Sequence, residues 1–139
     1  MCEFTKSEKI TQTDTDIYVF KVFIRLKYGK WQAPVYDKIY KRNILHTAKI
    51  NVIHCKAPYI NFLTETGLYS FDDEKHARKY KDYLTNNNII LEKYVIVKCL
   101  IPKGSRVIIC GDKEHKVGEH GAHIIVSNQL IPLKEIKNV

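Results

Sequence analysis

The alternation over residues 17–28 between a wholly apolar set of positions and a face that holds three cations constrains the fold of this chain more than any other feature. Every second residue is apolar, and the intervening positions include the cations Lys21, Arg25 and Lys27. This period of two is typical of a strand with one buried side and one solvent-facing side. The apolar set predicted to face the core is Tyr18, Phe20, Val22, Ile24, Leu26 and Tyr28.

Further strands are predicted where short apolar runs stand between turn residues. After a turn at Gly29, residues 33–40 are expected to pair back on the first strand and to make a basic N-terminal hairpin with it. Pro132 lies in the last apolar run and predicts a bulge or an edge position there. The other predicted strands are residues 48–54, 94–101, 106–110, 122–130 and 131–136.

One helix is predicted over residues 72–84. Ser70 with Asp73 three residues later resembles a capping box, and an acidic first turn suits the positive end of a helix. The apolar stripe at helical spacing is His76, Ala77, Tyr80, Tyr83 and Leu84.

These elements predict an α+β fold, with a curved, mostly antiparallel sheet, one main helix (about 72–84) and the basic N-terminal hairpin. Residues 1–15 are polar and without periodicity, so a flexible tail is expected there. Residues 16–139 are expected to form a single domain, since their number suits one hydrophobic core.

The positive charge of the chain is unevenly distributed. Its net charge is +8, and residues 21–56 carry nine cationic side chains against the single carboxylate of Asp37. Such a field favours an anionic partner, which could be nucleic acid, a nucleotide or an acidic host protein surface. The alternative is the solvated face of a lysine-rich protein.

Aromatic residues stand among these cations. Rings stack on bases while cations hold phosphates, so the mixture suits single-stranded nucleic acid or a nucleotide. The alternative is that the rings pack in the core between paired strands. The candidate binding residues are Lys21, Arg25, Lys27, Lys30, Trp31, Tyr36, Lys38, Tyr40, Lys41 and Arg42.

Motifs of the commonest enzyme classes are missing from the sequence. It holds no phosphate-binding glycine-rich loop, no GxGxxG, no HExxH and no paired CxxC motif. No cofactor is therefore expected. A polar loop carries four metal-ligating residue types whose spacing matches no compact zinc module, and we expect it to be only a loop: Cys110, His115, His120 and His123.

The expected location is the cytoplasm, which would be that of a host cell if a phage encodes the chain. No apolar run approaches the length that spans a bilayer, and the N-terminus lacks the apolar stretch of a signal peptide. The four cysteines are accordingly expected to be free thiols. No membrane partner is predicted.

Three segments resemble the middle of ADP-ribosyltransferase-type domains. They are GLYSFDDEKHARKY (67–80), VIVKCLIPKGS (95–105) and IIVSNQLIPLKEI (124–136). The resemblance implies a degenerate form of that fold, with Tyr69, Ser70, Ser127 and Gln129 as the candidate catalytic residues of a transferase. Where the family has its catalytic glutamate, residues 127–129 read Ser-Asn-Gln, so the resemblance implies a version without activity.

The sequence is also similar in style to small uncharacterised phage and mobile-element proteins. It predicts a small, basic, non-enzymatic binding protein of that type, for which an anti-defence inhibitor acting on a nucleic acid, a nucleotide signal or a host nucleoprotein complex is one role. The first alternative is an NAD-using enzyme of the ADP-ribosyltransferase kind. The second alternative is a virion or structural accessory protein.

Overall fold

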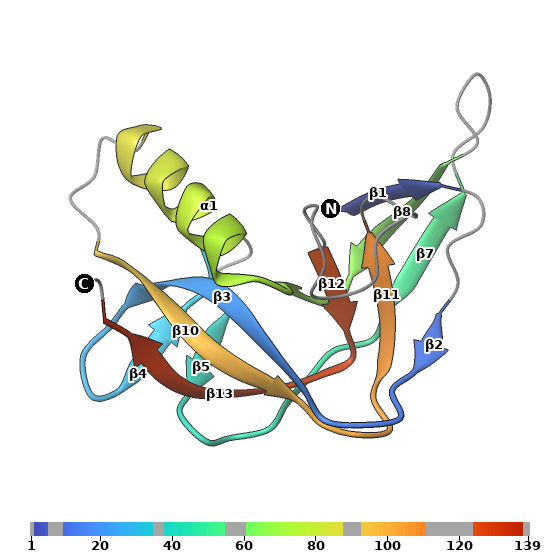
Figure 1. The fold of residues 1–139 in the computed structure, drawn as a ribbon, viewed down its shortest axis with the longest axis horizontal. Coiled ribbons are helices and arrows are strands. Elements are labelled where there is room, and N and C mark those ends of the chain that lie inside the picture. Colours follow the sequence, from blue (N-terminus) through green and yellow to red (C-terminus); the bar gives the residue numbers. More distant parts are fainter. Residues whose placement is uncertain are drawn as a thin grey trace.

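The computed structural model describes residues 2–5, 10–34, 38–54, 61–87, 93–110 and 124–137. Within them the chain forms one helix and thirteen strands, all of whose pairings are antiparallel (Figure 1). The elements are β1 (Cys2–Thr5), β2 (Thr11–Gln12), β3 (Ile17–Arg25), β4 (Lys30–Gln32), β5 (Ile39–Lys41), β6 (His46–Thr47), β7 (Asn51–His54), β8 (Asn61–Thr66), β9 (Leu68–Phe71), α1 (Glu74–Asn87), β10 (Tyr94–Ile101), β11 (Arg106–Cys110), β12 (Ile124–Ser127) and β13 (Gln129–Ile136).

A curved sheet with β3 and β10 at its centre forms the body of the molecule. Its strand order is β2-β11-β12-β9-β3-β10-β13-β6, and β4 and β5 extend it from β3. The β3–β10 pairing runs from Ile17 opposite Ile101 to Ile24 opposite Tyr94. A second sheet has the order β1-β8-β7. The predicted coarse class, a mostly antiparallel sheet with one helix, is thus present.

Both faces of β3 are covered, so the prediction of one solvent-facing side is wrong. Val19 and Phe23 are fully buried on one face, in a cluster with residues of β4, β5 and β10. Val22 lies on the other face and is buried together with Ala77 of α1. Figure 1 shows this helix lying over the sheet next to β3. Because α1 reaches along only part of this second face, Tyr18 at its far end is 54% exposed instead of buried.

The helix begins one turn later than the capping pattern predicts. Asp73 is the cap, since its Oδ1 accepts a hydrogen bond from the backbone N–H of His76 over 2.9 Å. Ser70 instead lies in β9, buried, and donates its hydroxyl to the carbonyl of Ile125. Of the predicted stripe, Ala77 is fully buried, but Tyr83 is 61% exposed and does not belong to it.

Two predictions about the strands have different outcomes. The bulge expected at Pro132 is confirmed, because the β10–β13 register jumps from Lys98 opposite Lys134 to Cys99 opposite Pro132. The basic N-terminal hairpin is not confirmed in its predicted form. Residues 30–32 pair with β3, residues 39–41 pair with β4 instead of β3, and residues 35–37 lie outside the described part.

Two short strands, β1 and β2, fall within the segment for which a flexible tail is expected. β1 pairs with β8 and β2 pairs with β11. Thr13 is buried and exchanges backbone hydrogen bonds with Gly104 and Ser105, which ties the chain to the β10–β11 turn. Among the residues that the structure describes, no helix is both long and apolar enough to cross a membrane.

Candidate functional site

Lys21 was expected on the outward face of the first strand, and this expectation is wrong. Its side chain is buried, and Nζ donates a hydrogen bond to the backbone carbonyl of Tyr69 over 2.5 Å. The ammonium group also lies 5.7 Å from the ring centres of Phe23 and Tyr40. Burial lowers the pKa of Lys21 to about 8. Such a group cannot hold an external phosphate.

Trp31 and Tyr40 are buried as well, with only 4% and 2% of their surface exposed. Both rings pack beside Phe23, whose ring centre is 5.9 Å from that of Trp31 and 4.9 Å from that of Tyr40. They are therefore core residues, and the expectation that they interleave with cations on the surface is wrong. Burying such large rings stabilises the β3–β4–β5 layer.

Other predicted binding residues differ in how far they are exposed. Lys27, Lys30 and Lys41 are exposed, and Arg42 is exposed while its Nε donates to the carbonyl of Leu133 over 2.8 Å. Lys38 turns back on the protein, with Nζ 3.1 Å from the carbonyl oxygen of Thr47 and 5.5 Å from the Tyr40 ring centre. Tyr36 lies outside the described residues.

A hollow of about 420 Å³ lies beside the turn between β3 and β4. We call it the turn hollow. Its cations come from three separate parts of the chain, because Arg42 follows β5 and Lys134 belongs to β13. The lining residues are Arg25, Leu26, Gly29, Lys30, Trp31, Arg42, Lys134 and Glu135.

Glu135 organises the wall of the turn hollow. It accepts hydrogen bonds from Nε of Arg25 over 2.9 Å and from the second guanidinium nitrogen, and also from the indole N–H of Trp31 over 3.0 Å. The hydrogen bond from Arg25 lowers the pKa of the Glu135 carboxyl. The bidentate pair neutralises this carboxylate. The net charge of the turn hollow is therefore positive and comes from the remaining cations, Lys30, Arg42 and Lys134.

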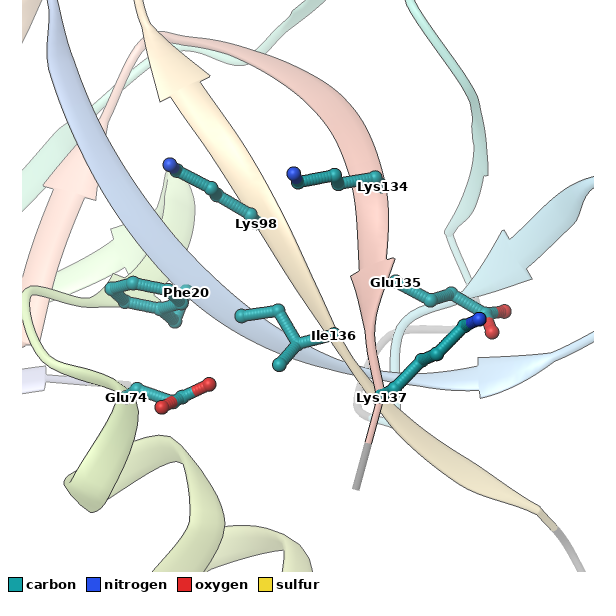
Figure 2. A pocket seen from close by; sticks show the side chains of 7 residues that line it. All are labelled: Phe20, Glu74, Lys98, Lys134, Glu135, Ile136 and Lys137. Atoms are coloured by element: carbon teal, nitrogen blue, oxygen red, sulfur yellow. The ribbon is translucent and has the colours of Figure 1, made fainter. Parts of the chain in front are cut away.

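A second hollow, of about 510 Å³, lies between the start of α1 and the sheet (Figure 2). We call it the helix-side hollow. It shares Lys134 and Glu135 with the turn hollow, so the two adjoin along β13. Its lining residues are Phe20, Glu74, Lys98, Lys134, Glu135, Ile136 and Lys137.

Two pairs of lysines face each other directly across neighbouring strands of this surface. Lys98 of β10 is opposite Lys134 of β13, and Figure 2 shows their side chains next to each other, extending to the same side. Lys30 of β4 is opposite Lys41 of β5. Like charges in direct cross-strand register repel and destabilise a sheet. A bound anion between them would offset this repulsion.

Lys98 is held in place by an aromatic neighbour. Its Nζ lies 4.6 Å from the ring centre of Tyr18, the residue that the helix leaves uncovered. This contact keeps the ammonium group over the open part of the sheet. Together the two hollows present lysine and arginine N–H donors, the groups that bind phosphate oxygens. The two hollows lie on opposite sides of the sheet, because Phe20 packs on the side of α1 and Trp31 on the other, and they meet around β13. We call the two hollows together the basic face.

Reasoning from the sequence missed the half of the basic face that β10 and β13 supply. Lys98, Lys134 and Lys137 lie outside the cation-rich segment 21–56 and come together only through strand pairing. One signal could have found Lys98, because it is the single charged residue in the apolar run YVIVKCLI. A lone cation in a buried strand needs a local opening to solvent or a partner.

The residues of the transferase resemblance lie on paired strands at some distance along the sheet from these hollows. Val126 of β12 is opposite Tyr69 of β9, and Ser127 is buried with its hydroxyl on the carbonyl of Leu68. Gln129 accepts a hydrogen bond from the Ser105 hydroxyl over 3.1 Å. Neither the turn hollow nor the helix-side hollow is lined by Tyr69, Ser70, Ser127 or Gln129.

The metal candidates are not placed by the structure. His115, His120 and His123 lie outside the described residues, as does the side chain of Cys110. Elsewhere, among the side chains that are described, no group of three His, Cys, Asp or Glu residues could hold a metal ion.

Comparison of the chain with protein-family models, with curated proteins and with solved structures finds no match.

Proposed function

We propose that this chain is a non-enzymatic binding protein whose basic face holds the phosphates of a nucleic acid. The observation that carries the proposal is the direct opposition of Lys98 and Lys134 across β10 and β13. Two ammonium groups in register cost stability in the absence of an anion. A phosphate between them would turn the repulsion into two charge-assisted hydrogen bonds.

The charge of the two hollows supports a polyanion over a single small anion. Six cationic side chains and two carboxylates line them, and one of the carboxylates, Glu135, is already neutralised by Arg25. The cations extend over strands β3, β4, β10 and β13 instead of converging on one point. A backbone with a phosphate at every nucleotide suits such an extended surface.

A phage or mobile-element origin and an anti-defence role stay predictions from the style of the sequence. The hollows give no support to transferase activity, because none of its candidate residues lines them. The buried hydroxyls of Ser70 and Ser127 are both hydrogen-bonded to backbone carbonyls.

The test compares two double variants that change the charge equally. Lys98→Glu with Lys134→Glu reverses the opposed pair, whereas Lys75→Glu with Lys79→Glu reverses two exposed lysines of α1 outside both hollows. Binding of a labelled oligonucleotide is measured by fluorescence anisotropy at several salt concentrations. We expect the first variant to bind at least about tenfold more weakly, with a salt slope smaller by about 1 to 2, because phosphate contacts are lost.

The helix variant should bind nearly as tightly as the wild type. Equal affinity of the two variants would contradict the proposal, as would a wild-type protein that binds polyglutamate and no nucleic acid. The second result would assign the basic face to an acidic protein partner.

A further inference from the structure

Tyr28 occupies a position in the β3–β4 turn that is unfavourable for its side chain. Its φ is 63°, and the next residue, Gly29, has a φ of 69°. Turns that need positive φ at two successive residues prefer Asn–Gly, because a bulky side chain is strained in the left-handed region. A tyrosine here costs stability that asparagine at the same place would not cost.

Packing within the protein does not compensate for this strain. Tyr28 is 93% exposed, more than any other large hydrophobic residue described. A ring in that state gains almost nothing from burial. Strained residues that the fold itself does not need are frequent where a ligand is contacted. The ring is therefore placed for a partner outside the chain.

The surroundings of Tyr28 indicate the chemistry of that partner. Leu26 and Gly29 on either side of it in the turn line the turn hollow, together with the cations Lys30 and Arg42. Lys27, directly before Tyr28, is exposed. An exposed aromatic ring beside several cations suits a chain of unstacked bases joined by phosphates.

We propose that Tyr28 is a base-stacking residue and that the basic face is specific for single-stranded nucleic acid. A base stacks on the Tyr28 ring while the neighbouring phosphates bind Lys30, Arg42 and Lys134 in the turn hollow. A duplex would gain the phosphate contacts alone, because its bases are already stacked on one another. This inference rests on the proposed function and adds to it the class of nucleic acid and the residue that selects it.

The experiment separates stacking from charge with three single substitutions. Tyr28→Asn removes the ring and suits the backbone conformation, so the variant should fold at least as stably as the wild type. Tyr28→Phe keeps the ring. Tyr83→Ala is the matched control, because it removes another exposed tyrosine, which lies on α1 outside both hollows.

The probes are a labelled oligothymidine of about 15 nucleotides and a labelled duplex of the same length. Tyr28→Asn should weaken binding of the single strand by about tenfold, leave the salt slope unchanged because no charge is lost, and leave duplex binding unchanged. Tyr28→Phe and Tyr83→Ala should bind the single strand as the wild type does.

Different failures can be told apart. If Tyr28→Asn binds the single strand as tightly as the wild type while Lys98→Glu with Lys134→Glu loses binding, the stacking inference is wrong and the proposed function stands. If the wild type binds neither probe at low salt, both proposals are wrong. If Tyr28→Asn weakens both probes equally, the selection of single strands is wrong.

Discussion

The ammonium group of Lys21 donates a hydrogen bond to the backbone carbonyl of Tyr69 inside the core, and it forms no ion pair with a carboxylate of the described residues. The described groups that act on it include the rings of Phe23 and Tyr40, the thiol of Cys99 and the ammonium of Lys38. A lysine in such a place makes the stability of the protein depend on pH in an unusual direction.

Stability should rise between about pH 7 and 9. Burial lowers the pKa of Lys21 from 10.5 in the unfolded chain to about 8 in the folded protein, so around pH 8 to 9 the unfolded chain holds this proton more often than the folded protein does. A rise in pH therefore disfavours the unfolded state, and the free energy of unfolding increases. The stabilising effect is fully present above pH 10.5 and is lost as pH falls through about 8. We expect a gain of about 1 kcal/mol between pH 7 and 9, measured by urea unfolding.

Towards pH 10 the rise should level off and then reverse. Burial raises the pKa of the Cys99 thiol from 9.0 to about 12, so the unfolded chain loses this proton first and is favoured. Lys21→Met should remove the rise between pH 7 and 9, whereas Lys27→Met, at an exposed position, should preserve it. A pH profile of Lys21→Met that matches the wild type would contradict the burial of this amine.

Glu135→Gln should change stability and binding in opposite directions. The substitution weakens the hydrogen bonds from Arg25 and Trp31, and because both ionic partners are partly exposed we expect a loss of about 1 kcal/mol at pH 7. It also removes a negative charge from both hollows, so nucleic-acid affinity should increase. Urea unfolding and anisotropy measure the two effects, and a variant that loses both stability and affinity would show that Glu135 acts mainly by positioning Arg25.

The stability difference between the wild type and Glu135→Gln should depend on pH in the acid range. The hydrogen bond from Arg25 lowers the pKa of Glu135 below its usual 4.5, so its stabilising effect is present above pH 4.5 and is lost as pH falls through the lower folded value. The difference in unfolding free energy between the wild type and Glu135→Gln should therefore shrink from pH 5 to pH 3. A constant difference over this range would contradict the ion pair.

Asp73→Ala should destabilise the protein by about 1 kcal/mol, because the backbone N–H of His76 loses its acceptor at the start of α1. Asp73→Asn should retain most of the stability, since an amide oxygen also caps a helix. Thermal unfolding followed by circular dichroism measures both. Equal melting temperatures for Asp73→Ala and the wild type would show that another residue caps the helix.

Gly67→Ala should cost about 3 kcal/mol. The φ of Gly67 is 140°, and an added Cβ would overlap Cγ1 of Val126, so backbone strain and steric overlap add. Gly29→Ala is the matched control, because its φ is 69° but no atom lies within 4 Å of the added Cβ. That variant should lose only about 1 kcal/mol, from backbone strain alone. Similar urea midpoints for the two variants would contradict the overlap at Val126.

Sequence patterns predicted the position of elements better than the faces they bury. The apolar run of β10 was predicted with its observed bounds, and Pro132 indicated its bulge, because both features are local. The prediction that β3 has one solvent-facing side was wrong mainly for a non-local reason. Elements from elsewhere in the chain, α1 and β5, cover its two sides, and within the strand only apolar residues at intervening positions, such as Val19 and Phe23, indicated this.

The candidate site was predictable only in part for a related reason. Arg25, Lys30 and Arg42 line the turn hollow as members of the predicted cationic segment, whereas Lys134 joins them through strand pairing. Trp31 is of a residue type that can stack on bases, but it is buried in the core, where its indole N–H donates a hydrogen bond to Glu135. A ring gains more from burial than from solvent exposure, so composition alone could not identify Tyr28 as the exposed one.

The central position of β3 has a consequence for the synthesis of the protein. Its long partner in the sheet is β10, which comes in the chain only after β4 to β9 and α1. A ribosome adds about 5–20 residues per second, so for several seconds the nascent chain carries β3 with both apolar faces and its strand edge uncovered. Until residues 94–101 emerge, this segment is the natural target of a chaperone and the natural start of aggregation.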